Sequence, residues 1–102
     1  MTPSQKIYKY PVEITDGQII HVPAGARVIS VVGQNYGIVL YAIVPIPNDF
    51  PKISKELVIK VVGTGHEINF NTVNEYEFLG TVLLHGGSLV FHVFCKDRGY
   101  MG

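Results

Sequence analysis

The chain has few of the residues that build covalent cross-links, metal clusters or strongly charged surfaces. Of its 102 residues one is cysteine, Cys95, none is tryptophan, and 16% are charged, well below the usual quarter. A single cysteine excludes an internal disulfide and any zinc or iron–sulfur site that needs several cysteines. We therefore expect a reduced, cytoplasmic setting and an inert free thiol.

The charges that are present balance each other. Eight basic and eight acidic residues give a formal net charge of zero, and only two of the basic residues are arginines, Arg27 and Arg98. Nucleic-acid binding relies on clustered Lys and Arg side chains that face phosphates, so nucleic acid is not an expected partner. A small surface with few charges must expose apolar or uncharged polar area, which favours a protein-binding face.

Long hydrophobic segments are also missing. The longest apolar run lies near Ile38–Ile46, far short of the roughly 20 residues that a membrane-spanning helix needs. The polar residues Ser4, Gln5, Lys6 and Lys9 interrupt the start of the chain, so no signal peptide is expected. No segment keeps a 3.6-residue period over the roughly ten residues of a helix. Neither membrane association nor a sizeable helix is predicted.

What the chain contains instead is a series of β-branched and aromatic runs, separated by turns that carry Gly or Pro. Runs spaced by roughly 8–12 residues are typical of an antiparallel all-β domain. We predict about seven antiparallel strands in a small sandwich or distorted barrel. They form one β domain over residues 1–95, followed by a flexible C-terminal tail at residues 96–102. The predicted strands are Lys6–Ile14, Gln18–Val22, Arg27–Val32, Ile38–Val44, Glu56–Val62, Glu75–Leu84 and Ser88–Cys95.

Individual residues of the first half refine this pattern. Pro11 cannot donate a ladder hydrogen bond, which predicts an edge strand or a bulge at Lys6–Ile14. The Thr15–Gly17 turn predicts that this strand pairs with Gln18–Val22 as a hairpin. The nearly continuous apolar run Ile38–Val44 is typical of a central strand that is buried on both faces.

The second half of the chain is predicted to end in another hairpin. This hairpin turns at His85–Ser88, and Gly80 indicates a bulge or bend in its first strand. Three prolines predict an extended loop at Pro45–Pro51. The polar stretch Gly65–Asn74 predicts a long loop.

The histidines offer the first candidates for chemistry. With one nearby carboxylate, the candidate metal ligands are His21, His66, Glu67, His85 and His92. Zinc needs three or four converging ligands, usually with close spacing along one element, and no two of these histidines lie two or four residues apart. We predict no metal site.

The Gly-rich stretch Gly63–Glu67 invites comparison with a phosphate-binding loop. It lacks the Lys, the Ser or Thr and the helix that such a loop requires, so a sharp turn explains its glycines. For nucleophilic catalysis, Cys95 lies three residues after His92 and faces the opposite side of a strand. Glu75 and Glu77 share a strand face that is expected to be solvated. No enzyme activity and no cofactor are predicted.

Aromatic residues are the most suggestive content of the chain. Tyrosine supplies large amphipathic contact area of the kind that interfaces favour. Five of the six tyrosines are candidates for such contacts: Tyr8, Tyr10, Tyr36, Tyr41 and Tyr76. For Tyr41 and Phe78 we expect a place in the core, and for Tyr36, in a loop next to Gly37, an exposed position.

Several patches, in a specific order along almost the whole chain, carry a family resemblance. They are Ile7–Pro11, Asp16–Gln18 with Ile20, Pro23–Ala26 followed by Ser30 and Val31, Gly63–His66, Phe78–Thr81 and Gly87–Phe94. Together they resemble a family of short proteins encoded in phage and prophage genomes, known only as a domain of unknown function. The resemblance implies a phage accessory protein in the host cytoplasm, and it brings no catalytic residues. This sequence departs from the family by continuing for eight residues after Phe94.

A second resemblance is to the cupin barrel, in which a Pro-x-Gly turn precedes a strand. The turn Val22–Gly25 is similar to it. The His-x-His pair and the downstream Glu that hold a cupin metal are missing, so the resemblance implies no metal chemistry.

The leading functional hypothesis is a non-enzymatic β domain that binds a host or phage protein or itself, as a homodimer or higher homo-oligomer. In one version of this hypothesis the protein counteracts a host defence system, either by covering the surface of a defence protein or by sequestering a signalling nucleotide. A nucleotide pocket would draw on Arg27, Tyr36, Lys60 and His66, which could supply charge and stacking. The rival hypothesis is a small virion component, such as a decoration or adaptor protein.

Overall fold

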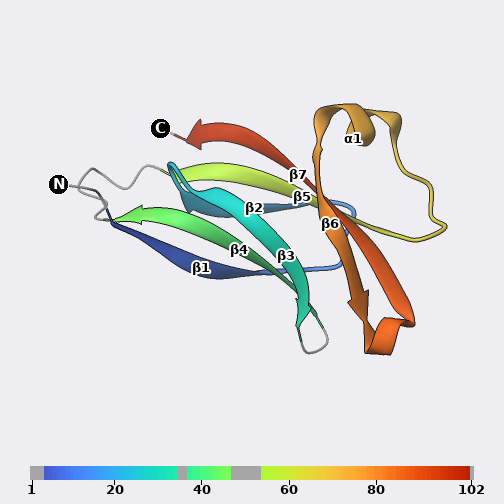
Figure 1. Ribbon diagram of the computed structural model, residues 1–102. Helices are drawn as coiled ribbons and strands as arrows, with labels where there is room; N and C mark the ends of the chain where they lie inside the picture. Colours follow the sequence, from blue (N-terminus) through green and yellow to red (C-terminus); the bar gives the residue numbers. More distant parts are fainter. Residues whose placement is uncertain (1–3, 35–36, 47–53, 102) are drawn as a thin grey trace.

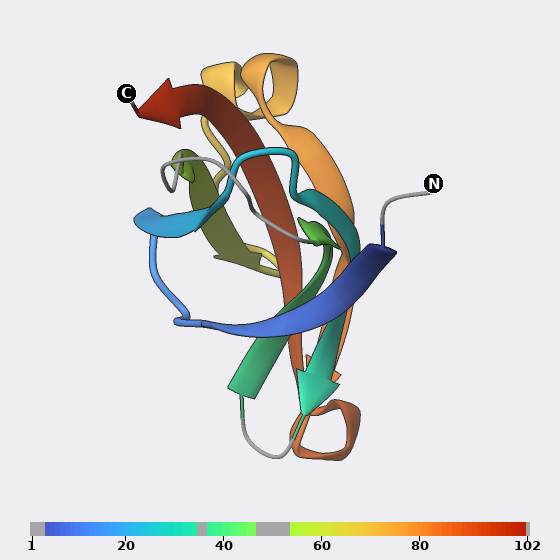
Figure 2. The ribbon, with the colours of Figure 1, turned by 90° about the vertical axis from the view of Figure 1, so that its left-hand side faces the viewer.

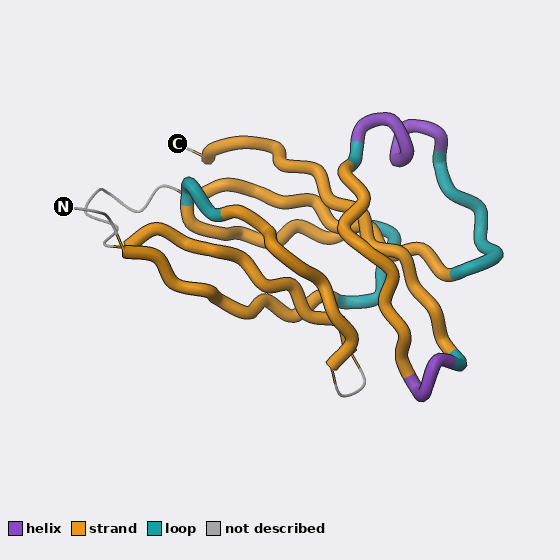
Figure 3. The backbone as a smooth tube through the Cα atoms, viewed as in Figure 1, coloured by secondary structure: helices purple, strands orange, loops and turns teal. Residues whose placement is uncertain are grey.

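A computed structural model describes residues 4–34, 37–46 and 54–101 of the chain (Figure 1). Within these residues the backbone forms seven strands, one short α-helix and one 3₁₀ turn (Figure 3). The elements are β1 (Ser4–Val12), β2 (Gln18–Pro23), β3 (Arg27–Gln34), β4 (Gly37–Ile46), β5 (Ser54–Gly63), α1 (Phe70–Glu75), β6 (Glu77–Leu84), η1 (His85–Gly87) and β7 (Leu89–Met101).

The strands form two antiparallel sheets that pack against each other. One has three strands in the order β1-β4-β3, and the other has four in the order β2-β5-β7-β6 (Figures 1 and 2). The prediction of an all-β domain with seven antiparallel strands is confirmed. The arrangement is a sandwich, and its two sheets do not close into one continuous barrel.

The core lies between the sheets and draws on both. Because side chains alternate between the two faces of a strand, every second residue of β4 and β5 points inward. Leu40 is 1% exposed, and Ile59 and Val93 are fully buried. The buried cluster comprises Val12, Val22, Ala26, Ile38, Leu40, Val44, Leu57, Ile59, Val61, Val82, Leu84, Val93 and Cys95. Removal of this apolar area from water is the main force that holds the sheets together.

Several local predictions are confirmed. The strand that contains Pro11 lies at the edge of its sheet, and the strand that contains Ile38–Val44 lies at the centre. The last two strands, β6 and β7, pair as a hairpin, and the register of β6 shifts between Phe78 and Gly80. Each of these features follows from residues at the position itself: Pro11 for the edge strand, the unbroken apolar run for the central strand and Gly80 for the bulge.

The predicted hairpin between the first two strands is wrong. β1 pairs with β4 and β2 pairs with β5, so the turn between them carries the chain from one sheet to the other. The side chain of Gln18 bridges this turn: its Nε2 donates to the backbone oxygen of Glu13 at 2.6 Å, and its Oε1 accepts from the Glu13 N–H at 3.0 Å. The amide thereby satisfies backbone groups that a hairpin ladder would otherwise pair.

The boundary expected after Cys95 is also wrong, because β7 continues to Met101. Residues beyond Cys95 pair with β5, for example Lys96 with Val58. The Nζ of Lys55 lies 2.8 Å from Oδ2 of Asp97, whose Oδ1 accepts from the Gly99 N–H at 2.8 Å. The polar composition of this segment suggested a tail, but its polar groups bond locally and to the neighbouring strand.

The long loop predicted at Gly65–Asn74 contains helix α1 in its second half. The Asn69 side chain caps the helix by accepting from the N–H of Asn71 at 2.7 Å, and Thr72 is buried at 2% exposure. The helix is shorter than the segment over which a 3.6-residue period can be recognised, which explains why the sequence did not reveal it. None of the described helices is long and apolar enough to cross a membrane.

The two sheets meet closely along one side, where the edge strands β3 and β6 face each other. A Cβ atom placed on Gly33 of β3 would lie 2.7 Å from the backbone oxygen of Leu83 of β6. A Cβ atom placed on Gly80 of β6 would lie 3.1 Å from Cγ1 of Val31. Both glycines therefore sit where the backbone of one sheet contacts the other. We call this contact the closed seam, and the β1–β2 side of the sandwich the open seam.

Candidate functional site

The residues predicted to form a nucleotide pocket do not converge. Arg27, Lys60 and His66 line three different cavities, and Tyr36 lies outside the described residues. The three cavities differ in charge and in the elements that surround them, so each is considered separately.

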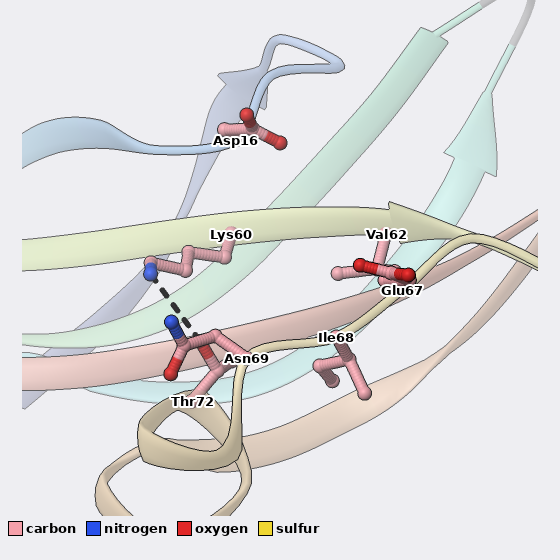
Figure 4. A pocket seen from close by; sticks show the side chains of 7 residues that line it. All are labelled: Asp16, Lys60, Val62, Glu67, Ile68, Asn69 and Thr72. Atoms are coloured by element: carbon pink, nitrogen blue, oxygen red, sulfur yellow. Dashed lines mark hydrogen bonds between the residues drawn. The ribbon is translucent and has the colours of Figure 1, made fainter.

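The Lys60 cavity lies on the outer face of the four-stranded sheet and has a volume of about 370 Å³ (Figure 4). Strand β5 supplies its floor, and the connection that leads to α1 forms one wall. The turn between β1 and β2 adds Asp16 from above, as Figure 4 shows. Its lining residues are Asp16, Lys60, Val62, Glu67, Ile68, Asn69 and Thr72.

Neutral groups hold the Lys60 side chain. Its Nζ donates to Oγ1 of Thr72 at 3.2 Å and lies 5.1 Å from the centre of the Tyr76 ring. Such contacts orient an ammonium without neutralising it. Two carboxylates, Asp16 and Glu67, line the same cavity as this one ammonium. The local charge therefore suits a small polar or cationic group better than a phosphate chain, which the two carboxylates would repel.

The His66 cavity is smaller, about 180 Å³, and contains a second histidine, His92. The ring of His92 is held from both sides. Its Nε2 lies 2.8 Å from Oγ1 of Thr64, and its Nδ1 lies 3.0 Å from Oγ1 of Thr81. A neutral imidazole donates at one nitrogen and accepts at the other, so one threonine accepts while its counterpart donates. His92 thereby links Thr64, in the segment that follows β5, to Thr81 of β6. Because both ring nitrogens are bonded, the ring has no free lone pair for a metal or a substrate proton.

The candidate metal and catalytic residues are also separated. Glu67 lines the Lys60 cavity, His66 and His92 share the smaller one, and His85 lies in the β6–β7 turn. Over residues 4–34, 37–46 and 54–101, no three His, Cys, Asp or Glu side chains gather as metal ligands.

The Arg27 cavity, about 420 Å³, opens between the two sheets and contains Cys95. Burial, and then the nearby carboxylates of Glu77 and Asp97, raise the pKa of Cys95 to about 11. The thiol is therefore protonated at neutral pH, where a nucleophilic cysteine needs a thiolate. His92 does not pair with it, since His92 faces outward and Cys95 belongs to the core.

The aromatic predictions have mixed outcomes. Phe78, expected in the core, is 52% exposed and packs against Phe94 with ring centres 5.4 Å apart. Its position follows from the bulge, because the register shift between Phe78 and Gly80 turns the residues before it to the opposite face. Tyr41 is half-buried but stands on the outer face of β4, outside the inter-sheet cluster. Both departures come from register, which single-residue propensity does not encode.

The most distinctive surface is the outer face of the three-stranded sheet, and the sequence did not single it out. Inward residues of β4 belong to the core, so the alternate residues point outward. The strand register places Ile7 beside Ile43, and it places Val39 between Pro11 and Val32. We call this surface the β4 face; it consists of Ile7, Pro11, Val32, Val39, Tyr41 and Ile43.

Exposure shows how open the β4 face is. Ile7 is 59% exposed and Val32 is 39% exposed, while Val39 at its centre is 9% exposed without belonging to the core cluster. The outer face of the four-stranded sheet is different, because the connection between β5 and β6 lies against it around His66 and Thr72. In the described part of the chain, no element covers the β4 face in the same way.

Comparisons with known proteins identify the family of this chain but no function. No curated protein and no solved structure matches the chain. Residues 3–100 match the family described as Domain of unknown function (DUF7352), and the chain belongs to this family.

Proposed function

We propose that this chain is a non-enzymatic phage accessory protein that binds a host or phage protein through the β4 face, in the cytoplasm of the infected host. The observation that carries the proposal is the apolar outer face of the three-stranded sheet, which none of the described elements covers. Counteraction of a host defence, by covering a surface of a defence protein, is the role that such a binder would most simply perform.

Three properties of the β4 face support protein binding. It combines aliphatic residues, a proline and the Tyr41 ring, the mixture that the centre of an interface favours. Polar and charged residues lie among its apolar ones: Lys9 and Ser30 flank Tyr41, and Arg27 lies beside Ile43 in the register. It is also built on strands, whose backbone changes little when a partner binds. An exposed apolar patch on a small protein commonly marks an interaction site.

The three cavities described above also support this choice, because none of them offers a free reactive group. His92 is bonded at both nitrogens, and the Cys95 thiol is protonated. Lys60 shares its cavity with two carboxylates. None of the three arrangements favours a nucleophile, a metal or a nucleotide.

The test is affinity capture from phage-infected host cells with the tagged protein and two variants. Val32→Lys places a charge on the β4 face at an exposed position. Leu83→Lys is the matched control, because Leu83 is also an exposed strand residue, at 60%, but lies on β6 of the other sheet. We expect wild-type protein and Leu83→Lys to retain the same protein in near-stoichiometric amount, and Val32→Lys to lose it at least tenfold.

Two results would contradict the proposal. One is the absence of any stoichiometric partner, and the other is capture that Val32→Lys does not reduce. Mass spectrometry of purified virions separates the rival role, since a stoichiometric amount of the chain in the particle would identify a structural component. A thermal-shift panel of cyclic and linear nucleotides separates the remaining alternative, because a pure protein binder responds to none of them.

A further inference from the structure

We propose that strand β1 pairs antiparallel with β1 of a second copy of this chain, so that two three-stranded sheets join into one six-stranded sheet. This inference rests on the proposed function and extends it, because the pairing places two β4 faces side by side. The argument concerns the free edges of the sandwich and the backbone groups that they expose.

The sandwich has four edge strands, and they are not equivalent. Strands β3 and β6 close against each other at Gly33 and Gly80. Strand β2 is six residues long and ends in Pro23. Strand β1 is nine residues long, and its first six residues are exposed. In Figure 2 β1 crosses in front of the other strands of its sheet, and within the described residues β4 is its only ladder partner. A long strand with one unpaired side is a template for another strand.

Pro11 shows which backbone groups of β1 are free. Within the β1–β4 ladder Pro11 lies opposite Val39, and without an N–H it cannot bond across this pair. Its backbone must therefore face away from β4. Since hydrogen-bonding direction alternates along an antiparallel strand, the N–H and C=O groups of Gln5, Ile7 and Lys9 also face the free edge. Those of Lys6, Tyr8 and Tyr10 bond to β4.

This alternation favours one register for the second copy. Pairing centred on Ile7 sets Ile7 opposite Ile7 and Gln5 opposite Lys9, so that each of these residues exchanges two hydrogen bonds with its counterpart. It leaves Pro11 outside the bonded part of the ladder. Pairing centred on Tyr8 would set Pro11 opposite Gln5, where one carbonyl finds no donor. Pairing centred on Lys6 or Lys9 would set two ammonium groups directly opposite each other, which is destabilising.

The favoured register also gives the charged residues suitable neighbours. Each Lys9 lies opposite a Gln5 side chain, which offers an acceptor for its ammonium. Each Lys6 lies opposite a Tyr8 ring, within reach of a cation–π contact. The two Ile7 side chains, each 59% exposed in the single chain, meet at the twofold axis. Ile7 lies beside Ile43 in each copy, so these four isoleucines form one apolar row that crosses the axis.

Disulfide trapping tests both the pairing and its register. Opposed residues of a hydrogen-bonded pair have Cα atoms about 5.5 Å apart, within the range that a disulfide bridges. Ile7→Cys should therefore yield a disulfide-linked dimer under mild oxidation. In the same register the two copies of residue 9 are about 13 Å apart along the strand axis, so Lys9→Cys is a matched control that should form at least tenfold less dimer.

The wild-type chain provides the background, because buried Cys95 should not cross-link. Light scattering across a concentration series should show wild-type protein changing from monomer to dimer. A strict monomer at high concentration, together with no linked dimer of Ile7→Cys, would overturn the inference. Faster linkage of Lys9→Cys than of Ile7→Cys would overturn it as well. Partner capture that is sensitive to Val32→Lys would then still stand, so failure of the pairing and failure of the proposed function can be told apart.

Discussion

The closed seam and the open seam lie on opposite sides of the same sandwich, and they differ in how closely their strands approach. At the closed seam, Gly33 and Gly80 let the backbone of one sheet contact the other. At the open seam, the Gln18 side chain satisfies the turn between β1 and β2, and each strand pairs only with its inner neighbour among the described residues. The glycines thus let the two sheets contact each other on one side, while on the other side the outer edges of β1 and β2 have no strand partner among the described residues.

The largest effect is expected at the closed seam. Gly33→Ala would place a Cβ atom 2.7 Å from a backbone oxygen and 2.8 Å from Cδ2 of Leu84, and the backbone oxygen cannot rotate away. We expect a loss of about 3 kcal/mol in the free energy of unfolding, measured by urea denaturation. Gly37→Ala is the control, because nothing lies within 4 Å of its Cβ position. Equal stability of the two variants would contradict the close contact of β3 with β6.

The next effect compares adjacent residues of the open seam. Tyr8→Pro removes an N–H that bonds to β4 and should cost about 2 kcal/mol, whereas Ile7→Pro removes an N–H that faces the free edge and should cost under about 1 kcal/mol. Urea denaturation at low protein concentration measures both. If Ile7→Pro proves the more damaging substitution, the assignment of outward-facing groups along β1 is wrong.

A smaller effect is expected at Gly80, the second glycine of the closed seam. Its Cβ position lies 3.1 Å from a methyl carbon of Val31, and a side chain can shift more easily than a backbone. Gly80→Ala should therefore cost about 1 kcal/mol, less than Gly33→Ala in the same assay. A cost as large as that of Gly33→Ala would mean that Val31 has no freedom to move.

The smallest effect concerns the C-terminal part of β7, away from both seams. The hydrogen bond from Lys55 lowers the pKa of Asp97; burial opposes this shift, and the Gly99 N–H and the charge of Lys55 add to it. A depressed pKa in the folded state stabilises the fold above the unfolded pKa of about 3.9, and this contribution disappears as the pH falls through the folded value. Because Asp97 is 51% exposed, the gain should stay below about 1 kcal/mol.

The comparison of wild type with Asp97→Asn checks this expectation. Wild type should be the more stable of the two at neutral pH, and the difference should shrink as the pH falls below the unfolded pKa of about 3.9 and through the lower folded pKa. A difference that does not change with pH would exclude an ionic contribution from the Lys55–Asp97 pair.

The parts of the fold that the sequence predicted are those set by local chemistry. Pro11 indicated the edge strand, the apolar run at β4 indicated the centre, and Gly80 indicated the bulge. Strand pairing across the open seam was not predictable in this way, because the turn signal around Asp16 suits a hairpin and a passage between sheets equally well. The end of β7 was missed because its stabilising contact, from Lys55 to Asp97, joins residues that are distant in sequence.

The candidate site was less predictable than the fold. Residue type suggested Arg27, Lys60 and His66 as a group, but only the strand register decides which side chains share a surface, and it separates these three. The same register creates the β4 face, since Val32 and Val39 become neighbours only when β3 pairs with β4. Composition gave one useful hint of this surface, the low fraction of charged residues.

The central claim is that the open seam is an interaction edge. Residue-resolved hydrogen exchange of β1 at increasing protein concentration tests this claim most directly. The account predicts that the amides of Ile7 and Lys9 exchange rapidly in dilute solution and become protected as concentration rises. Tyr8 and Tyr10, bonded to β4, should be protected throughout. Unchanged, rapid exchange of Ile7 and Lys9 at every concentration would contradict the account.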